Sequence, residues 1–248
     1  MIKRIAATLV IDSGYIVNSY NFKIHLPVGK LKYTIQRLQD FGIDEIIILN
    51  TSHSSTSSQD FIQLLKSIDS LHISTPITYG GGITCVSDAR EIIRAGAERV
   101  VVSSKLLVNS NTLFEICSYL GEQALVLHMP IDHTIVQSKI GGHDLNDFQS
   151  VMNLLPSNWG GEVMVSFVES DGAKSPNWHN VNRFLVCAIG LKNLILAGGF
   201  ANAQDIGRAL SFDQISAVAV GNYLHREELS VRNLKLNIET AVEIRHSK

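Results

Sequence analysis

The chain has 248 residues, of which 45% are hydrophobic and 18% are charged, and its formal net charge is −2. This size suits one α/β barrel or two smaller domains, and the near-neutral charge argues against nucleic acid or an anionic membrane as a partner. No apolar run reaches the roughly 18 residues that span a bilayer, and the N-terminus leads directly into a strand without a signal peptide. The three cysteines are widely spaced and odd in number, which favours a reducing, cytoplasmic location over a disulfide framework.

Apolar runs of strand length recur along the chain. They are nearly continuous in Val, Ile and Leu, as in parallel strands that are buried on both faces. In chain order we predict strands at Ile5–Ile11, Glu45–Leu49, Pro76–Tyr79, Arg99–Val102, Ala124–Met129, Val163–Phe167, Asn193–Leu196 and Ala217–Val220.

Stretches with helical periodicity separate these runs. Each predicted helix carries apolar residues on one face. These apolar sets are Ile35, Leu38 and Phe41; Phe61, Leu64, Leu65 and Ile68; Ala89, Ile92 and Ile93; Leu113 and Ile116; and Leu234, Ile238 and Val242. The polar stretch Thr51–Gln59 is short enough to be one loop between a strand and a helix. Alternation of about eight strands and eight helices predicts an α/β fold, a (β/α)8 TIM barrel, with a doubly wound open sheet as the alternative.

One short pattern occurs twice. Gly81 and Asp88 in the first half of the chain match Gly198 and Asp205 in the second, with a constant offset (198 − 81 = 117 and 205 − 88 = 117). The repeat favours a single barrel domain over residues 1–248, built from half-barrels of about 1–122 and 123–248. In each copy a strand, a glycine pair and a helix start follow one another, and such turns bind phosphate through backbone N–H groups. Two copies predict a ligand with a phosphate at each end, although plain tight turns are the alternative.

Ligands of such barrels bind at the C-terminal ends of the strands, so residues that end a strand are candidates for the site. The predicted phosphate-binding residues are Gly81, Gly82, Ser103, Ser104, Gly198, Gly199, Gly221 and Asn222. Asp171 is a candidate catalytic carboxylate, or else a residue that caps its Asp-Gly turn. His128 is expected to line the barrel as a hydrogen-bonded histidine and not to act as a base. No histidine pair has the spacing of metal ligands on one helix face, so we expect neither a metal nor a cofactor.

The order of several short motifs resembles the HisF family, the cyclase subunit of imidazole glycerol phosphate synthase. The resemblance covers the whole chain and is carried by Lys3–Ile5, Asn21–Phe22, Gly42–Glu45, Gly80–Ile83, Ala95–Val100, Gly121–Ala124, Gly161–Glu162, Asp171–Gly172 and Ala197–Gly199. It implies that a HisH-like glutaminase docks at the N-terminal face of the barrel. Ammonia then passes through the barrel to a substrate held by two phosphates at the C-terminal face.

The two catalytic aspartates that the resemblance implies are absent. Val10 stands at the first position and Pro130 at the second. Asn18 replaces the family's lysine of the first loop, and Asn50 replaces a further aspartate. Loss of one acid–base group usually costs about 10²–10⁴-fold in rate, so loss of both should abolish the cyclase reaction. Asp12 or Asp132, two residues further on, are the alternatives, since a two-residue shift preserves the side of the strand.

The N-terminal face keeps four charges at strand starts: Arg4, Glu45, Arg99 and Glu162. The resemblance implies that these four residues gate the ammonia inlet, whereas solvated surface charges are the alternative. The resemblance also implies that Glu98 and Gln123 face the glutaminase. The loss of the first aspartate together with the retained charges resembles a branch of HisF-like proteins associated with surface glycans, which also lacks that aspartate. The resemblance implies a subunit that channels ammonia, together with a third, sugar-modifying protein, for acetamidino-sugar synthesis. The alternatives are an authentic cyclase of histidine biosynthesis and a non-catalytic scaffold that binds a phosphorylated small molecule. No nucleic acid or membrane partner is expected.

Overall fold

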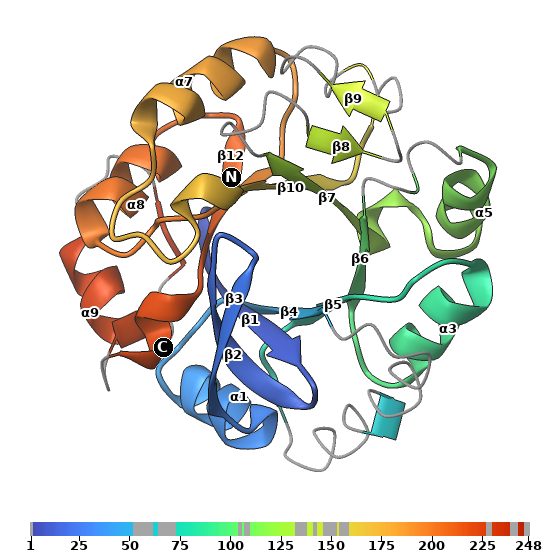
Figure 1. The fold of residues 1–248 in the computed structure, drawn as a ribbon, viewed down its shortest axis with the longest axis horizontal. Helices are drawn as coiled ribbons and strands as arrows, with labels where there is room; N and C mark the ends of the chain where they lie inside the picture. Colours follow the sequence, from blue (N-terminus) through green and yellow to red (C-terminus); the bar gives the residue numbers. More distant parts are fainter. Residues whose placement is uncertain are drawn as a thin grey trace.

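Parallel strands close into a barrel in which the last strand pairs with the first. The computed structural model describes residues 2–51, 62–63, 73–103, 106, 110–131, 138–140, 143–145, 153, 159–226, 230–238 and 243–245. Within this part of the chain the barrel wall runs in the order β1, β4, β5, β6, β7, β10, β11, β12, and β12 pairs with β1. This closure confirms the predicted (β/α)8 barrel and excludes the open doubly wound sheet (Figure 1).

All eight predicted strands are confirmed, each within two residues of its predicted ends. The barrel strands are β1 (Arg4–Asp12), β4 (Glu45–Asn50), β5 (Ile77–Gly80), β6 (Arg99–Ser103), β7 (Leu125–Ile131), β10 (Glu162–Phe167), β11 (Leu194–Ala197) and β12 (Ile215–Val220).

Alternate residues of the strands face the inside and the outside of the barrel. The outward side chains form one large core with the helices, in which Ile5, Leu9 and Ile46 are fully buried. The inward side chains form a second, smaller cluster. Its members are Ala6, Ile47, Val101, Val126, Met164, Ile195, Ala197, Ala217 and Ala219. The interior is therefore apolar, and alanines supply much of its β1, β11 and β12 side.

Helices cover the outside of the wall, as Figure 1 shows. The described helices are α1 (Leu31–Asp40), α3 (Val86–Arg94), α5 (Ser110–Leu120), α7 (Trp178–Cys187), α8 (Ala203–Leu210) and α9 (Ser230–Asn237), with 3₁₀ turns η1 (Glu122–Ala124), η2 (Val168–Ser170) and η3 (Asn222–His225). The apolar faces predicted for α1, α3 and α5 are buried at Ile35, Leu38, Ala89, Ile92 and Ile116. Most of the helix predicted around Phe61–Ile68, and the loop Thr51–Gln59 beyond its first residue, lie outside the described residues.

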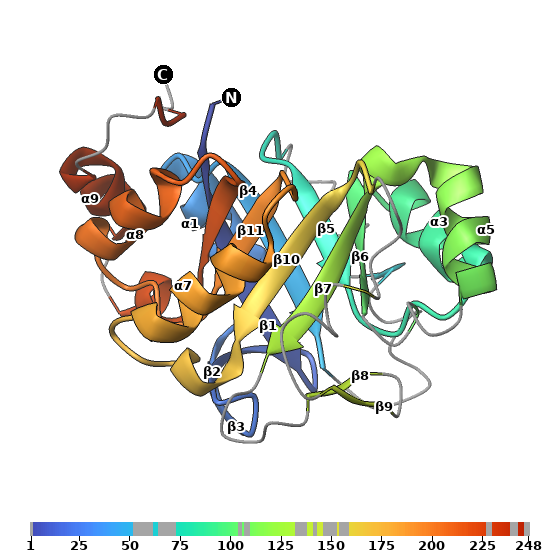
Figure 2. The ribbon, with the colours of Figure 1, turned by 90° about the horizontal axis from the view of Figure 1, so that it is seen from above.

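Beyond β1 the chain forms a two-stranded extension that the sequence did not predict. Strands β2 (Tyr15–Tyr20) and β3 (Ile24–Gly29) continue antiparallel from β1 through a tight turn at Ser13 and Gly14, both of which have positive φ. We call β2, β3 and the turn between them the β2–β3 ribbon. It lies at the C-terminal end of the barrel, as does the separate pair β8 (Ser138–Ile140) and β9 (His143–Leu145) (Figure 2). The start of β1 lies at the opposite end (Figure 2), where Lys3 pairs with Ile244. None of the helices in the described ranges combines the length and the apolar character that a membrane span needs.

Candidate functional site

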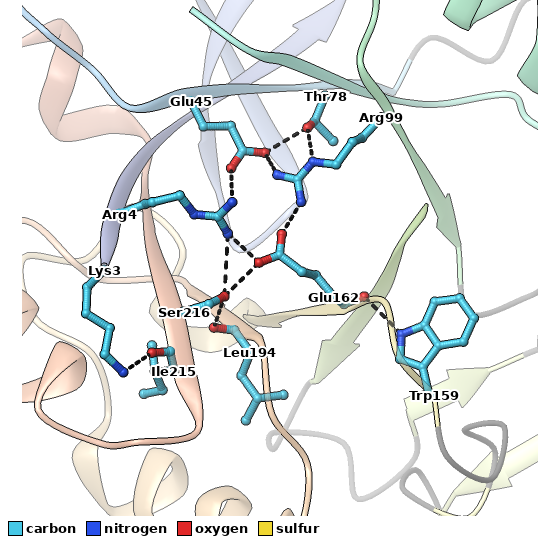
Figure 3. A network of polar contacts seen from close by, with 10 residues as sticks. All are labelled: Lys3, Arg4, Glu45, Thr78, Arg99, Trp159, Glu162, Leu194, Ile215 and Ser216. Carbon is cyan, nitrogen blue, oxygen red and sulfur yellow. Dashed lines mark hydrogen bonds and ion pairs between the residues drawn. The ribbon is translucent and has the colours of Figure 1, made fainter. Parts of the chain in front are cut away.

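Four charged side chains meet inside the N-terminal opening of the barrel (Figure 3). Arg4 and Arg99 each form ion pairs with both Glu45 and Glu162. The Arg4 Nη1 to Glu45 Oε2 distance is 3.4 Å. The sequence predicted these four residues, and the structure brings them together into one closed ring of alternating charge. We call this arrangement the charged ring.

Neighbouring hydroxyl groups complete the ring. Thr78 Oγ1 donates to Glu45 Oε1 at 2.7 Å and accepts from Arg99 Nε at 3.3 Å. Ser216 Oγ lies 2.8 Å from Glu162 Oε1. The sequence prediction missed both hydroxyl residues, although each lies at the start of a strand, beside a predicted charge. The ring is therefore held by hydrogen bonds as well as by charge.

The ring is enclosed enough for its charges to affect one another strongly. Glu45 is 1% exposed, and the side chains of Arg99 and Glu162 are about 15% exposed. Burial raises the pKa of Glu162, but the charges of Arg4 and Arg99 outweigh it, so the net pKa lies below its ordinary value. Burial likewise opposes the charge of Arg99, but Glu45 and Glu162 outweigh it and raise its pKa. Arg99 and Glu162 are thus held in their charged forms at neutral pH.

Glu98 and Gln123 lie beside this opening, at the starts of β6 and β7. Both side chains are exposed. The Glu98 amide donates to the Ile77 carbonyl at 2.8 Å, and Gln123 Nε2 donates to the Gly160 carbonyl at 3.0 Å. Both are accessible at the N-terminal face, where the sequence placed them. Their contact with a partner stays a prediction.

At the opposite end, a cavity of about 550 Å³ opens between β1, β4, β5, β6 and β7. Val10 and Pro130 line it, at the ends of β1 and β7. The structure therefore places these two residues at the mouth of the barrel, where a carboxylate could meet a ligand. Neither side chain can exchange a proton.

The first glycine turn forms one wall of this cavity. Gly81 and Gly82 line it, together with Ser103. Gly81 has φ 129° and Gly82 has φ 69°, and a Cβ on Gly81 would overlap the backbone of Asn50. Asp88 accepts from the amides of Thr84 at 2.8 Å and Cys85 at 3.1 Å, which fixes the start of α3. The glycines are thus required by the backbone itself, and phosphate binding there stays a prediction. Ser104 lies outside the described residues.

The second glycine turn resembles the first in having positive φ at both glycines. Gly198 has φ 100° and Gly199 has φ 81°. A Cβ on Gly199 would lie 2.7 Å from the Ser175 carbonyl oxygen. Asp205 occupies the same place in α8 that Asp88 occupies in α3, and it accepts from Ser175 Oγ at 2.6 Å. The two turns are therefore similar in structure as well as in sequence.

The surroundings of the second turn differ from those of the first. It lines a separate cavity of about 60 Å³, together with Asp171, Gly221 and Asn222. The Ser19 amide donates to Asn222 Oδ1 at 3.1 Å, and Asn222 Nδ2 donates to the Ser19 carbonyl at 2.6 Å. Asp171 Oδ2 accepts from Ser19 Oγ at 2.6 Å and from the Phe22 amide at 3.2 Å. We call these four contacts the ribbon clamp, since they hold the β2–β3 ribbon against the second half of the barrel.

The clamp gives two predicted site residues a structural partner. Burial raises the pKa of Asp171, and the hydrogen bonds from Ser19 and Phe22 oppose that rise. Both polar atoms of the Asn222 side chain, Oδ1 and Nδ2, bond to the backbone of Ser19. In this conformation Asp171 Oδ2 and both side-chain polar atoms of Asn222 bond to the ribbon, and the roles of these residues toward a ligand remain predictions.

Two histidines line the larger cavity. His128 Nε2 lies 2.8 Å from Ser166 Oγ, and burial lowers the pKa of His128 to about 4, so the imidazole is neutral at physiological pH. His25 Nδ1 lies 2.9 Å from Asp12 Oδ2, and both side chains line the cavity. The sequence raised Asp12 as an alternative carboxylate but did not identify His25, whose place depends on the unpredicted ribbon.

A family described as "Histidine biosynthesis protein" matches residues 4–230. The chain belongs to this family. HisF-like relatives match across nearly the full length: "Imidazole glycerol phosphate synthase subunit HisF" of Alkaliphilus metalliredigens is 26% identical, over 95% of each chain. The proteins of the same name from Bacillus pumilus and Bacillus subtilis are 26% and 24% identical, over 99% and 94% of this chain and 100% and 94% of their own length. Membership in the family agrees with the barrel and with the resemblance identified from the sequence.

Proposed function

We propose that this HisF-like chain is the ammonia-receiving barrel of a glutamine-dependent amidotransferase complex. A HisH-like glutaminase docks at the N-terminal face, and ammonia passes the charged ring and the barrel interior to the C-terminal face. The observation that carries the proposal is the contrast between the two ends. The charged ring is complete, whereas Val10 and Pro130 occupy the acid–base positions.

The charged ring supports the proposal that ammonia enters at the N-terminal face. Two arginines and two glutamates in a low-dielectric opening hold one another and exclude other cations and anions. Ammonia is small and neutral, so it can pass when one ion pair opens. The Arg4–Glu45 contact at 3.4 Å is the longest of the four, and Arg4 is the most exposed member. Arg4 is therefore the side chain that we expect to move.

The barrel interior supports the proposed path of ammonia from the charged ring to the C-terminal face. Above the ring lie apolar side chains, and those on β1 and β12 are the small residues Ala6, Ala217 and Ala219. Thr8 comes next on the inner side of β1, and its buried hydroxyl has no hydrogen-bond partner among the described residues. Buried hydroxyls normally find a partner. Passing ammonia would supply one.

The relatives are named as a subunit of a synthase, which supports an assembly of more than one chain. The resemblance to HisF-like proteins associated with surface glycans, which also lack the first aspartate, supports an acetamidino-sugar product made with a third protein. The cyclase of histidine biosynthesis is the second candidate, favoured by the name of the relatives alone. Turnover of the family's bisphosphate substrate with ammonium salts, or rescue of a histidine auxotroph, would establish that candidate and refute the acetamidino-sugar product.

The experiment is a pull-down from native extract with the tagged barrel, followed by a glutaminase assay with and without added barrel. We expect a co-purified glutaminase whose hydrolysis of glutamine rises at least tenfold when the barrel is present. A matched barrel with Glu98→Lys, which reverses an exposed charge at the same face, should bind more weakly. A barrel that binds no glutaminase, or that binds one without raising its activity, would refute the proposal.

A further inference from the structure

We propose that His25 and Asp12 form a proton-accepting pair in the cavity at the C-terminal face, where His25 acts as the base and Asp12 positions it. The reaction is the addition of ammonia to an activated acyl or imidoyl carbon. Such a carbon is doubly bonded to oxygen or nitrogen and carries a leaving group through oxygen. The proposal rests on the proposed function only for its source of ammonia.

The carboxylate of the pair lies farther along β1 than Val10. Asp12 follows Val10 by two positions, so both side chains leave the strand on the same side. At about 3.3 Å per residue, the Asp12 backbone stands roughly 7 Å beyond that of Val10. The ribbon supplies the histidine at this level, because His25 pairs with Ser19 across β2 and β3 and both residues line the cavity. Acid–base groups are therefore present at this face, although not at the end of the barrel strands.

The hydrogen bond between the two side chains orients the imidazole. His25 Nδ1 lies 2.9 Å from Asp12 Oδ2, and Ser13 Oγ donates to Asp12 Oδ1 at 3.1 Å. An ionised Asp12 can only accept hydrogen bonds, so the proton of the neutral imidazole lies on Nδ1 and Nε2 carries the lone pair. Within the described part of the chain, Nε2 of His25 has no hydrogen-bond partner. A histidine held in this way by a carboxylate is oriented to act as a base.

The other histidine of the cavity is unsuited to this role. His128 Nε2 already bonds to Ser166 Oγ at 2.8 Å, and burial lowers the pKa of His128 to about 4, which makes it a weak base. The side chain of His25 is 20% exposed, and it interacts electrostatically with Asp171 as well as with Asp12. A carboxylate beside a histidine stabilises the imidazolium that forms when the ring takes a proton. The surroundings thus favour His25 as the proton acceptor.

The cavity brings ammonia and the pair together. Leu49 and Val101 pack in the inward-facing cluster of the barrel, and both also line the cavity of about 550 Å³. Ammonia that travels along the interior therefore reaches the cavity at these side chains. Asp12 and His25 line the same cavity, whose volume also accommodates a small acyl substrate.

In the proposed step the lone pair of ammonia forms a bond to the substrate carbon, and the double-bond electrons move to its oxygen or nitrogen. The added nitrogen then loses one proton to His25 Nε2, which gives an imidazolium. The double bond forms again as the bond to the leaving oxygen breaks, and the electron pair of that bond stays on the oxygen. The imidazolium returns its proton to this oxygen. The products are an amide or amidine and a hydroxyl compound.

The test is ammonolysis of p-nitrophenyl acetate by the full chain with ammonium chloride, at a mildly alkaline pH and without a glutaminase. Release of p-nitrophenolate and formation of acetamide are measured together. We expect a protein-dependent rate that rises with the concentration of free ammonia. His25→Gln should lower this rate about 10²-fold or more, as for loss of a general base. The matched control is His179→Gln, which removes a histidine of α7 outside the cavity and should leave the rate unchanged.

The positioning role of Asp12 has a separate measurement. Nitrogen-15 NMR of the wild type should show the neutral His25 ring protonated on Nδ1, and Asp12→Ala should lose this preference. The same variant should lower the rate of ammonolysis less than His25→Gln does, because the base remains. A purely structural role of Asp12 would lower the rate without moving the proton between the two ring nitrogens.

Four results would overturn the proposal. They are no protein-dependent ammonolysis by the wild type, an unchanged rate in His25→Gln, an equal loss in His179→Gln, and a wild-type His25 ring protonated on Nε2. Circular dichroism of each variant establishes that it is folded. Because the assay uses ammonium salts, its failure leaves the ammonia-receiving proposal standing. Failure of the glutaminase assay would remove the source of ammonia and leave the measured reaction at His25 unaffected.

Discussion

Arg99 of β6 and Glu162 of β10 form an ion pair inside the barrel, over the intervening strand β7. Glu45 of β4 also forms an ion pair with Arg99, and β5 lies between β4 and β6 in the wall. These two contacts therefore link strands that do not pair with one another. Its residues close the N-terminal opening and also tie the two sides of the wall together.

Removing one member of the ring should destabilise the barrel. Glu162→Ala leaves Arg99 and Arg4 partly buried with one carboxylate between them, and loss of one partner of a buried ion pair costs about 3–5 kcal/mol. The measurement is chemical denaturation. The control is Glu98→Ala, an exposed carboxylate at the same face, which should change the free energy of unfolding by at most about 0.5 kcal/mol. Equal effects of the two substitutions would show that the ring contributes nothing to stability.

Acid should weaken the ring through Glu162. Its folded-state pKa lies below its ordinary value, so its stabilising contribution is complete above the ordinary pKa and is lost as the pH falls through the folded value. The free energy of unfolding should therefore fall more steeply with acid in the wild type than in Glu162→Gln. Denaturation at a series of pH values measures both slopes. Parallel slopes would contradict the coupling of Glu162 to Arg4 and Arg99.

His128 should stay neutral over the physiological range. Its pKa of about 4 reflects burial, so an NMR titration of the imidazole should show a midpoint near that value. This depressed pKa adds stability above the unfolded pKa of about 6.5, and the added stability is lost as the pH falls toward 4. A midpoint near 6.5 would mean that water solvates the ring and that His128 could act as a base.

The second glycine turn should tolerate no side chain. Gly199→Ala places a Cβ 2.7 Å from the Ser175 carbonyl oxygen, on a residue whose φ is 81°. Backbone strain of this kind costs about 1–3 kcal/mol, and the overlap adds to it. The control is Gly29→Ala, where no atom lies within 4 Å of the new Cβ. Thermal unfolding should separate the two variants by several degrees, whereas similar melting temperatures would mean that the turn relaxes freely.

The ribbon clamp should control the exchange of backbone amides in β2. Asn222→Ala removes two hydrogen bonds to Ser19, each of which contributes about 0.5–1.5 kcal/mol. Hydrogen exchange at Ser19 and Phe22 should therefore quicken about tenfold or more, while exchange in β5 stays unchanged. Unchanged exchange at Ser19 would show that β2 is held by its strand pairing alone.

The sequence predicted the barrel because buried parallel strands are continuous apolar runs. The polar residues on either side of each run indicate where the strand begins and ends. The same rule missed the β2–β3 ribbon, since Asn18, Ser19 and Pro27 interrupt any apolar pattern there. The predicted strands placed the four charges at the N-terminal end of the barrel, because the starts of parallel strands meet at one face. The Asp12–His25 pair was not predictable, since these residues lie on different strands and meet only through the fold of the ribbon. The clamp was missed for the same reason, as 203 residues separate Ser19 from Asn222.

The charged ring also provides the most direct test of the ammonia-receiving role. The measurement is the rate of glutamine hydrolysis by the co-purified glutaminase, with wild-type barrel, with Arg99→Met and with the barrel absent. Our account predicts that wild-type barrel raises the rate at least tenfold. It also predicts that folded Arg99→Met, which breaks the ion pairs with Glu45 and Glu162, loses most of that stimulation. A glutaminase that hydrolyses glutamine at the same rate with and without the wild-type barrel would contradict it.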